Sequence, residues 1–414
     1  MEKQKLTNKE KYWILYDVGN SAFVLLVSTI IPIYFNYLTG TAGVSEVNSL
    51  AYWGYAASAA TIIVALIGQI LGTIADTKNY KKPLFTISMM VGVIGCAALA
   101  FPTSWVVFLA VFVIAKVGYN ASLIFYDSML VDVTEHDRMD VVSSYGYAWG
   151  YIGSCVPFII SLVFVLMYDK IGITMGTAMM IAFFLNAAWW FIVTIPLLKN
   201  YEQVNFAQMP AHPVSDSFQR LGHTLKDIKR EKNIFLYLLA FFFFIDGVYT
   251  IIEMATAYGS ALGLDSTGLL LALLVTQIVA FPFALIFAKC SKKYATDLLI
   301  KICILAYTGI ALFAIQLDKQ WEFWLLAVLV GMFSRSNSGI VTFLLCKNSF
   351  QAEKAGEYFG IYDICGKGAV FSWDDASWEC IAQLTNTANA GVAMITILFV
   401  IGFILFCKAA KLNK

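Results

Sequence analysis

Long apolar runs separated by short polar stretches make up most of the chain. A helix that crosses a membrane needs about 20 consecutive, mostly apolar residues, and twelve stretches meet this requirement. They span residues 12–38, 50–74, 83–101, 104–130, 143–168, 176–198, 234–259, 266–288, 297–317, 321–346, 357–384 and 388–407. The pattern predicts an all-α integral membrane protein with twelve transmembrane helices.

The longest polar stretch, residues 199–233, separates the first six predicted helices from the last six. We therefore expect an N-terminal six-helix bundle over 1–198, a cytoplasmic linker over 199–233 and a C-terminal six-helix bundle over 234–414. Weak internal similarity supports related halves, because GQILGTIADTKNYKKPLF (68–85) and FALIFAKCSKKYATDLLI (283–300) both lead from an apolar helix into a basic turn. Two pseudo-symmetric bundles are typical of secondary transporters, which bind substrate between the halves near the middle of the membrane.

The positions of lysine and arginine predict the orientation. Of the 28 such residues, 22 lie in the termini and in loops on one side, whereas the opposite loops hold only Lys170 and Lys319. Because loops rich in lysine and arginine stay in the cytoplasm, both termini are expected there. The first apolar run is too long for a signal peptide and lacks a small-residue cleavage site. We expect a multi-pass protein of the cell (plasma or inner) membrane, surrounded by the lipid bilayer.

Composition narrows the chemistry further. The chain is 60% hydrophobic and only 13% charged, whereas soluble domains are about 25% charged. The net charge of +1 gives no indication of nucleic acid as a partner. The eight cysteines include no C-x-x-C pair, and the three histidines lie in polar connecting segments. We expect no metal site, no cofactor and no enzymatic activity, since no nucleophile–base pair or phosphate loop stands out.

Polar residues recur at helical spacing within three predicted helices. Residues three, four, seven or eleven positions apart share one face of a helix, and a charge at mid-membrane costs about 2.5–3.5 kcal/mol. Such residues are therefore candidates for binding a substrate or a proton. The candidates are Asp17 and Asn20 in the first helix, Lys116, Asn120 and Asp127 in the fourth, and Asp246, Thr250 and Glu253 in the seventh.

Several of these residues have alternative interpretations. Asp17 lies one turn after Trp13 and could be a cap at the membrane interface. Lys116 could neutralise a carboxylate on a neighbouring helix. Asp127 lies near the end of its predicted helix, where it could belong to a gate or contact a loop. Asp246 and Glu253 lie deepest in their predicted helix and are the strongest candidates.

Residues 72–82, GTIADTKNYKK, resemble the signature loop of the major facilitator superfamily. The resemblance rests on Gly72, on Asp76 four residues later, and on the basic pair Lys81 and Lys82, which we place at the cytoplasmic interface. The usual arginine after the aspartate is Thr77 here, and the usual second glycine is Tyr80. The resemblance implies a role in conformational switching rather than in substrate binding. An ordinary basic turn is the alternative.

Further motifs resemble the vacuolar effluxer-like branch of that superfamily. They are YDVGNSAF (16–23), FYDSMLVDV (125–133), SSYGYAWGYIG (143–153), FFFFIDGVYTIIEMA (241–255) and GEYFGIYDICGKGA (356–369), in the order of the branch. The resemblance implies the major facilitator fold, with helices 1, 4 and 7 lining a central cavity. It also implies transport of a small organic solute by alternating access, with an amino acid and export as the best expectations.

Proton coupling through Asp17, Asp246 or Glu253 is a hypothesis, because a buried carboxylate has a raised pKa and can carry a proton. Lys116 would then be the counter-charge. We interpret Gly146, Gly150 and Gly153 as packing contacts rather than substrate contacts.

Two windows, 334–350 and 370–379, do not fit the pattern. The second contains SWDDASWE, with three acids inside a predicted membrane helix. Codons can be chosen for residues 334–346 so that a shift of one base reads Gln-Gly-Ala-Ile-Gln-Ala-Leu-Ser-Arg-Ser-Tyr-Phe, which is similar to the branch's pattern. We therefore hypothesise compensating frame shifts, which the nucleotide sequence would decide. Altered helices 10 and 11 also favour an alternative function: a non-transporting membrane sensor or assembly protein with the same fold.

Overall fold

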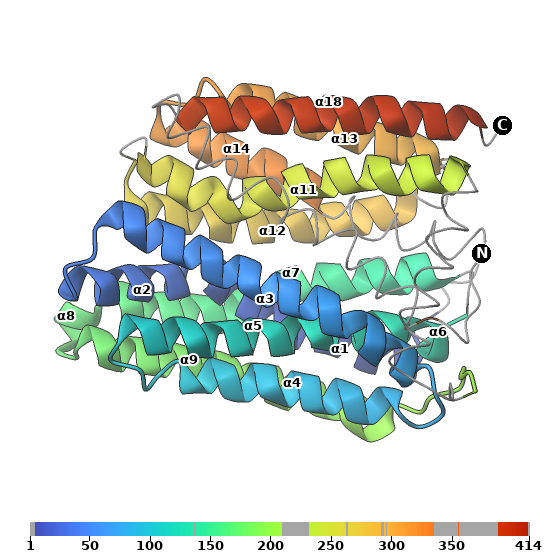
Figure 1. The fold of residues 1–414 in the computed structure, drawn as a ribbon, viewed down its shortest axis with the longest axis horizontal. Coiled ribbons are helices and arrows are strands. Elements are labelled where there is room, and N and C mark those ends of the chain that lie inside the picture. Colours follow the sequence, from blue (N-terminus) through green and yellow to red (C-terminus); the bar gives the residue numbers. More distant parts are fainter. Residues whose placement is uncertain are drawn as a thin grey trace. The chain divides into compact units, whose positions relative to one another are not determined.

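A computed structural model describes residues 5–135, 138–208, 232–261, 264–290, 296–334 and 388–412, together with Tyr294 and Ala355. The described part is almost entirely helical (Figure 1). Its helices are α1 (Asn8–Ser28), α2 (Ile30–Thr41), α3 (Glu46–Ala75), α4 (Lys81–Ala98), α5 (Trp105–Ser128), α6 (Leu130–Val133), α7 (Met139–Leu166), α8 (Tyr168–Ile171), α9 (Met175–Asn200), α11 (Lys232–Ala261), α12 (Ser266–Cys290), α13 (Thr296–Ala314), α14 (Gln320–Phe333) and α18 (Ala388–Leu412).

The described helices fall into two compact units: α1 to α9 form the first, and α11 to α18 form the second. In the first unit α1 packs against α7 and α9, and α4 packs against α5. In the second unit α11 and α13 pack against α18, and α12 packs against α14. The core of the second unit includes Phe244, Tyr307 and Phe399, all buried.

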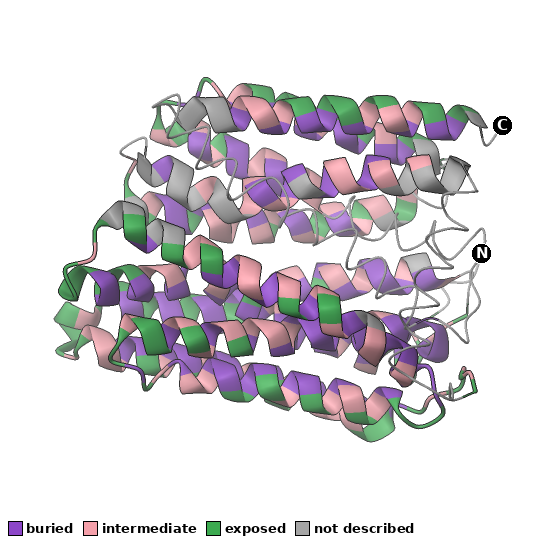
Figure 2. Cartoon of the chain, viewed as in Figure 1, coloured by how far each residue is buried: buried purple, intermediate pink, exposed green. Residues whose placement is uncertain are grey.

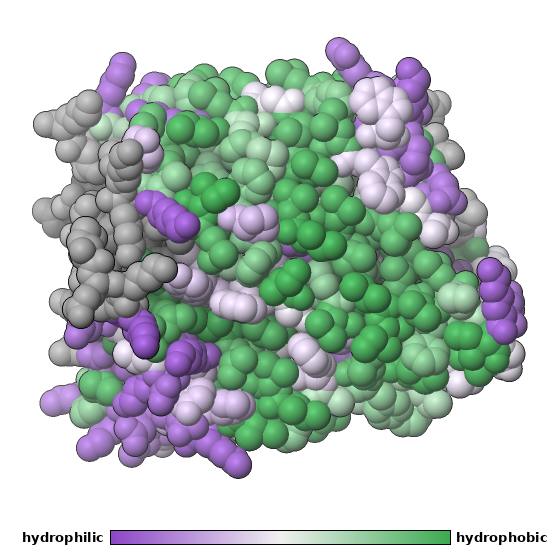
Figure 3. Space-filling model, turned by 180° about the vertical axis from the view of Figure 1, so that it is seen from behind, coloured by the Kyte–Doolittle hydropathy of each residue, from purple (hydrophilic) through white to green (hydrophobic). Residues whose placement is uncertain are grey.

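Within the described residues, seven helical segments are long and apolar enough to cross a membrane, and four further apolar helices are shorter. Many large apolar side chains on these helices are exposed, such as Leu66, Ile94 and Ile397, so that exposed and buried residues alternate around each helix (Figure 2). Hydrophobic residues cover the middle of the face shown in Figure 3, and hydrophilic residues gather toward its ends. This distribution suits a lipid environment. The predicted helix 357–384 and most of the two anomalous windows lie outside the described residues.

The first predicted span, 12–38, is two helices rather than one. α1 ends at Ser28, Thr29 has φ −136° and ψ −76°, and α2 begins at Ile30. Pro32 explains the interruption, because it has no N–H to donate to the Ser28 carbonyl and its ring clashes with that carbonyl. The Thr29 hydroxyl instead donates to the carbonyl of Leu25. The apolar pattern hides this break, because it continues unchanged on both sides.

Glycines allow two helix pairs in the first unit to approach closely. A Cβ atom on Gly118 of α5 would lie 2.4 Å from the backbone nitrogen of Gly92 in α4. On α7, a Cβ atom on Gly150 would lie 2.8 Å from the Ser21 hydroxyl, and one on Gly153 would lie 2.4 Å from Val18. Gly150 and Gly153 therefore make packing contacts with α1, as predicted.

Candidate functional site

Asp17 is buried inside the first unit, with 6% of its surface exposed. A Cβ atom on Gly146 of α7 would lie 2.9 Å from the Asp17 carboxylate, 3.0 Å from the Trp13 ring and 3.6 Å from the Tyr126 hydroxyl. Trp13 stacks on Tyr126 with 4.3 Å between ring centroids, and its indole N–H donates to the Tyr126 carbonyl at 3.0 Å. The carboxylate therefore lies against a glycine at the packed junction of α1, α5 and α7, beside an aromatic pair.

Asn20 lies one turn further along α1 and is 2% exposed. Tyr16 and Phe23, on the same face, contact α5: the Tyr16 hydroxyl lies 2.6 Å from that of Ser122, and Phe23 packs on Tyr119. The Asn20 amide nitrogen has no hydrogen-bond partner among the described residues. Because an unsatisfied buried donor costs about 1–3 kcal/mol, this amide is suited to binding a ligand or a water molecule.

The predicted residues of α5 differ in their surroundings. Asn120 is 4% exposed, whereas Lys116 and Asp127 are half-buried. The Lys116 ammonium lies 5.9 Å from the centre of the Phe112 ring and forms no ion pair with a described residue. Neutralisation of a neighbouring carboxylate by Lys116 is therefore not seen within the described part of the chain.

The candidates of the seventh predicted helix lie on α11, in the second unit. Thr250 is buried, with 5% of its surface exposed. The backbone of α11 includes Asp246 and Glu253, but their side chains lie outside the described part of the structure. The prediction that Asp246, Thr250 and Glu253 share one helical face therefore rests on their spacing alone.

The signature loop folds tightly between α3 and α4. Asp76 caps the C-terminus of α3 and is 3% exposed, and its N–H donates to the Gly72 carbonyl at 3.1 Å. Lys81 was expected at the membrane interface, but its side chain is fully buried and pairs with the Asp132 carboxylate at 3.2 Å. Lys82 is half-buried and donates to the Tyr201 carbonyl at 3.2 Å. The two ends of the loop thus form a packed polar junction, whereas Lys78, Asn79 and Tyr80 between them are exposed.

Asp132, which the sequence analysis did not select, lies at the centre of this junction. Its Oδ2 accepts hydrogen bonds from Lys81 at 3.2 Å and from the Tyr201 hydroxyl at 2.5 Å. Its Oδ1 accepts from the backbone N–H of Val204 at 3.2 Å and of Asn205 at 2.8 Å, and from the Asn205 amide at 3.0 Å. Burial, followed by the charge of Asp132, raises the pKa of Tyr201. Asp132 is the second aspartate of the motif FYDSMLVDV, and an acid in an apolar stretch could have indicated it. It lies five residues after Asp127, however, and therefore on a different face of a helix.

A second buried ion pair also escaped the sequence analysis. Glu10 is 1% exposed and accepts two hydrogen bonds from the Arg138 guanidinium, each at 2.9 Å. The Thr134 hydroxyl donates to the same carboxylate at 2.7 Å, and Thr7 forms a capping box with Glu10. The T-x-x-E pattern at 7–10 could have indicated the capping box, but it could not have indicated Arg138.

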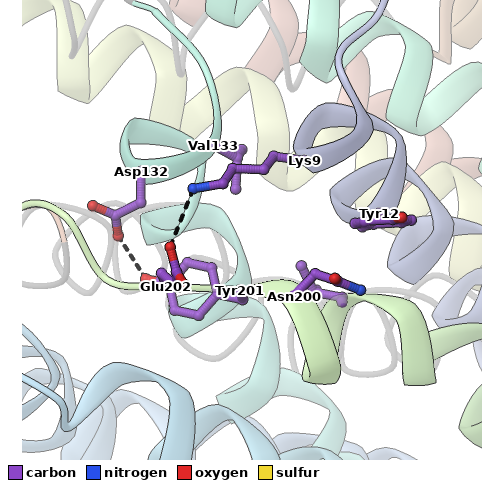
Figure 4. A pocket seen from close by; sticks show the side chains of 8 residues that line it. Lys9, Tyr12, Asp132, Val133, Asn200, Tyr201 and Glu202 are labelled. Carbon is purple, nitrogen blue, oxygen red and sulfur yellow. Dashed lines mark hydrogen bonds and ion pairs between the residues drawn. The ribbon is translucent and has the colours of Figure 1, made fainter.

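A small pocket opens beside Asp132 (Figure 4). An exposed ion pair between Lys9 and Glu202, 3.4 Å apart, crosses it, and such surface pairs contribute about 0–1 kcal/mol. Lys9, Tyr12, Asp132, Val133, Leu197, Asn200, Tyr201 and Glu202 line the pocket. Nothing in this lining resembles a substrate site. Across the described residues, no group of three or more His, Cys, Asp or Glu is arranged to hold a metal ion.

Comparison with known proteins places this arrangement in a family. The model of the vacuole effluxer Atg22-like family matches residues 7–137 and 131–411. The chain belongs to the vacuole effluxer Atg22-like family. The chain is similar over almost its whole length to the MFS-type transporter YxiO of Bacillus subtilis (strain 168). The two proteins are 39% identical over 411 residues, which cover 97% of this chain and 95% of YxiO.

Solved structures agree on the fold of this Atg22-like protein. The proton:xylose symporter XylE superposes with a TM-score of 0.69 at 14% identity, covering 97% of this chain and 94% of XylE. The human organic anion transporter MFSD10 superposes with a TM-score of 0.66 at 14% identity, covering 96% and 99%. The predicted major facilitator fold and family membership are therefore confirmed. The protein is a multi-pass membrane protein of the MFS transporter type.

Proposed function

We propose that this protein is a secondary active transporter that exports a small organic solute, with an amino acid as the substrate, by alternating access. Its family and its relative YxiO support transport in general. Two related bundles, over 1–198 and 234–414, would move against each other, joined by the linker 199–233. The bias of lysine and arginine supports cytoplasmic termini in the cell membrane.

The observation that carries the proposal is the pair of polar side chains buried on one face of α1. Asp17 offers a carboxylate that could accept the ammonium group of an amino acid or carry a proton. Asn20 offers an amide donor with no hydrogen-bond partner among the described residues, and Lys116 on α5 is a cation that forms no ion pair with them. A carboxylate, an amide and a cation are the kinds of group that an amino acid would require of its site. On α11, Asp246, Thr250 and Glu253 are further candidates because of their spacing along that helix.

Proton coupling is the second part of the proposal. Asp17 is buried at the packed junction of α1, α5 and α7, and carboxylates within membrane segments mark proton relays in pumps and transporters. A conformational change that admits water would release the proton. Binding on one side of the membrane and release on the other couples proton flow to solute flow.

The test uses purified protein in liposomes with an imposed pH gradient, monitored with a fluorescent pH indicator. Each standard L-amino acid is added in turn. A substrate should make the pH gradient decay faster in liposomes that contain the protein than in empty liposomes. Asp17→Asn and Asp246→Asn should each abolish the response. Asp169→Asn, a matched change at an exposed residue of α8, should leave it intact.

Two outcomes would overturn the proposal. If no amino acid changes the decay of the gradient and radiolabelled amino acids show no flux, amino-acid transport is wrong. If amino acids raise the Tm without any flux, the protein is a non-transporting sensor with the same fold. Gradient-independent flux that survives Asp17→Asn would remove proton coupling alone.

A further inference from the structure

The seven residues after α9, 201–207, lie in an extended conformation along the signature loop. Their exposure alternates: Tyr201 is buried and Gln203 and Asn205 are half-buried, whereas Glu202, Val204 and Phe206 are exposed. This period of two is that of a β-strand. An isolated parallel bridge joins Ala207 to Thr77, and the Ala207 N–H donates to the Asp76 carbonyl at 2.8 Å. We call residues 201–207 the docked segment.

Further bonds join the docked segment to both sides of the signature loop. The Gln203 side chain donates to the Ala75 carbonyl at 3.1 Å and accepts from the Lys81 backbone N–H at 3.4 Å. The Lys82 ammonium donates to the Tyr201 carbonyl, and the Lys78 ammonium lies 5.2 Å from the centre of the Phe206 ring. Both the end of α3 and the start of α4 are therefore tied to one short piece of chain.

Asp132 connects this piece of chain to the buried ion pair. One carboxylate accepts both the Lys81 ammonium and three hydrogen bonds from Val204 and Asn205. Both charged side chains are fully buried. If Lys81 withdraws, the buried Asp132 carboxylate loses the cation that contacts it, and such a charge is unstable until water reaches it. Movement of the docked segment away from Asp132, which its backbone N–H groups contact, would admit that water.

We propose that the docked segment is a latch, which closes when the Lys81–Asp132 pair forms and opens when that pair breaks. When the latch is closed, the chain stays attached to the first unit as far as Ala207. When the latch is open, the chain is attached only as far as Asn200, the last residue of α9. The role of the latch in transport rests on the proposed alternating-access function, whereas its coupled opening does not.

Hydrogen–deuterium exchange of the full-length protein in liposomes tests the coupled opening directly. The segment amides of Val204, Asn205 and Ala207 should share one opening rate with the loop amides of Tyr80 and Lys81, which are also hydrogen-bonded. Asp132→Asn should accelerate exchange at least tenfold in both peptides. The matched control is Glu202→Gln, since the Glu202 side chain is 80% exposed and pairs with Lys9 of α1; it should change neither peptide.

A second variant keeps the test decisive if Asp132→Asn does not fold. Thr77→Cys with Ala207→Cys places a thiol at each end of the parallel bridge. Oxidation should slow exchange at least tenfold in both the loop and the segment, and reduction should restore it. Exchange that slows in the segment but stays unchanged in the loop would overturn the latch. So would unequal opening rates of the two peptides in the wild-type protein.

The same double variant separates the two proposals. Oxidation should abolish the amino-acid response in liposomes, and reduction should restore it. A full response in the oxidised form would overturn the latch while leaving the transporter intact. If even the wild-type protein moves no amino acid, the proposed function fails, and the exchange comparison still decides whether segment and ion pair open together.

Discussion

Gly118→Ala should separate α4 from α5 and destabilise the first unit. The new Cβ atom would lie 2.4 Å from the Gly92 nitrogen and 2.9 Å from the Ser88 carbonyl oxygen, whereas ordinary contact begins at 3.4 Å. The helices must therefore part by about 1 Å, because backbone atoms cannot rotate away as a side chain does. Overpacking of this kind costs about 3 kcal/mol at the upper end of its usual range. The better helix propensity of alanine offsets about 1 kcal/mol.

The net loss of about 2 kcal/mol corresponds to a fall in Tm of roughly 4–8 °C for a unit of this size. Thermal unfolding of the detergent-solubilised protein, followed by tryptophan fluorescence, measures it. The matched control is Gly176→Ala in α9, where the nearest atoms to the new Cβ lie 3.9 Å away; its Tm should not fall. A Tm for Gly118→Ala equal to that of the control would refute the reasoning.

Three further predictions concern the buried polar groups. Breaking a fully buried ion pair costs roughly 3–5 kcal/mol. Glu10→Gln should lower the free energy of unfolding by less than this, because the Arg138 side chain is 16% exposed. The double variant Glu10→Gln with Arg138→Gln should recover part of the loss in the same thermal assay. Tyr201 has a raised pKa, so its contribution to stability is complete below the ordinary value of 10.0 and is lost as the pH rises above it; the difference in Tm between wild type and Tyr201→Phe should therefore shrink at alkaline pH. Gly146→Ala should displace the Asp17 carboxylate and reduce gradient-driven flux at least tenfold while lowering Tm by only a few degrees, and unchanged flux would show that this carboxylate tolerates movement.

The helices could be predicted because lipid imposes a simple rule on the sequence: a run of apolar residues of sufficient length. That rule located α3, α4, α5, α7, α9, α11, α12, α13 and α18 to within five residues at each end, and the start of α14 to within one residue, but it did not predict the short helices α6 and α8. It failed at Thr29, because Pro32 interrupts the backbone hydrogen bonds without changing the hydrophobicity. The apolar pattern carries no information about carbonyl groups that lose their donors.

The polar junctions were harder to predict, because their partners are distant in sequence. Lys81 reads as an interfacial lysine until Asp132, 51 residues away, is brought beside it. The sequence around Glu10 likewise indicates only a helix cap, and the structure is needed to show its ion pair with Arg138, which lies just before α7. Spacing along one helix identifies a shared face, as for Asp17 and Asn20, but it cannot say which neighbouring helix that face meets. Only the structure shows that the Asp17 carboxylate lies against Gly146 of α7.

The interruption at Thr29 gives the first membrane span two independent attachments. α1 packs on α7 and α9, which hold Asp17 and Asn20 in register with their surroundings, whereas α2 packs on α3 and α5. Rotation about the dihedral angles of Thr29 would change the tilt of α2 relative to α1. A continuous helix would transmit every such tilt to the carboxylate, whereas the break at Thr29 weakens that coupling.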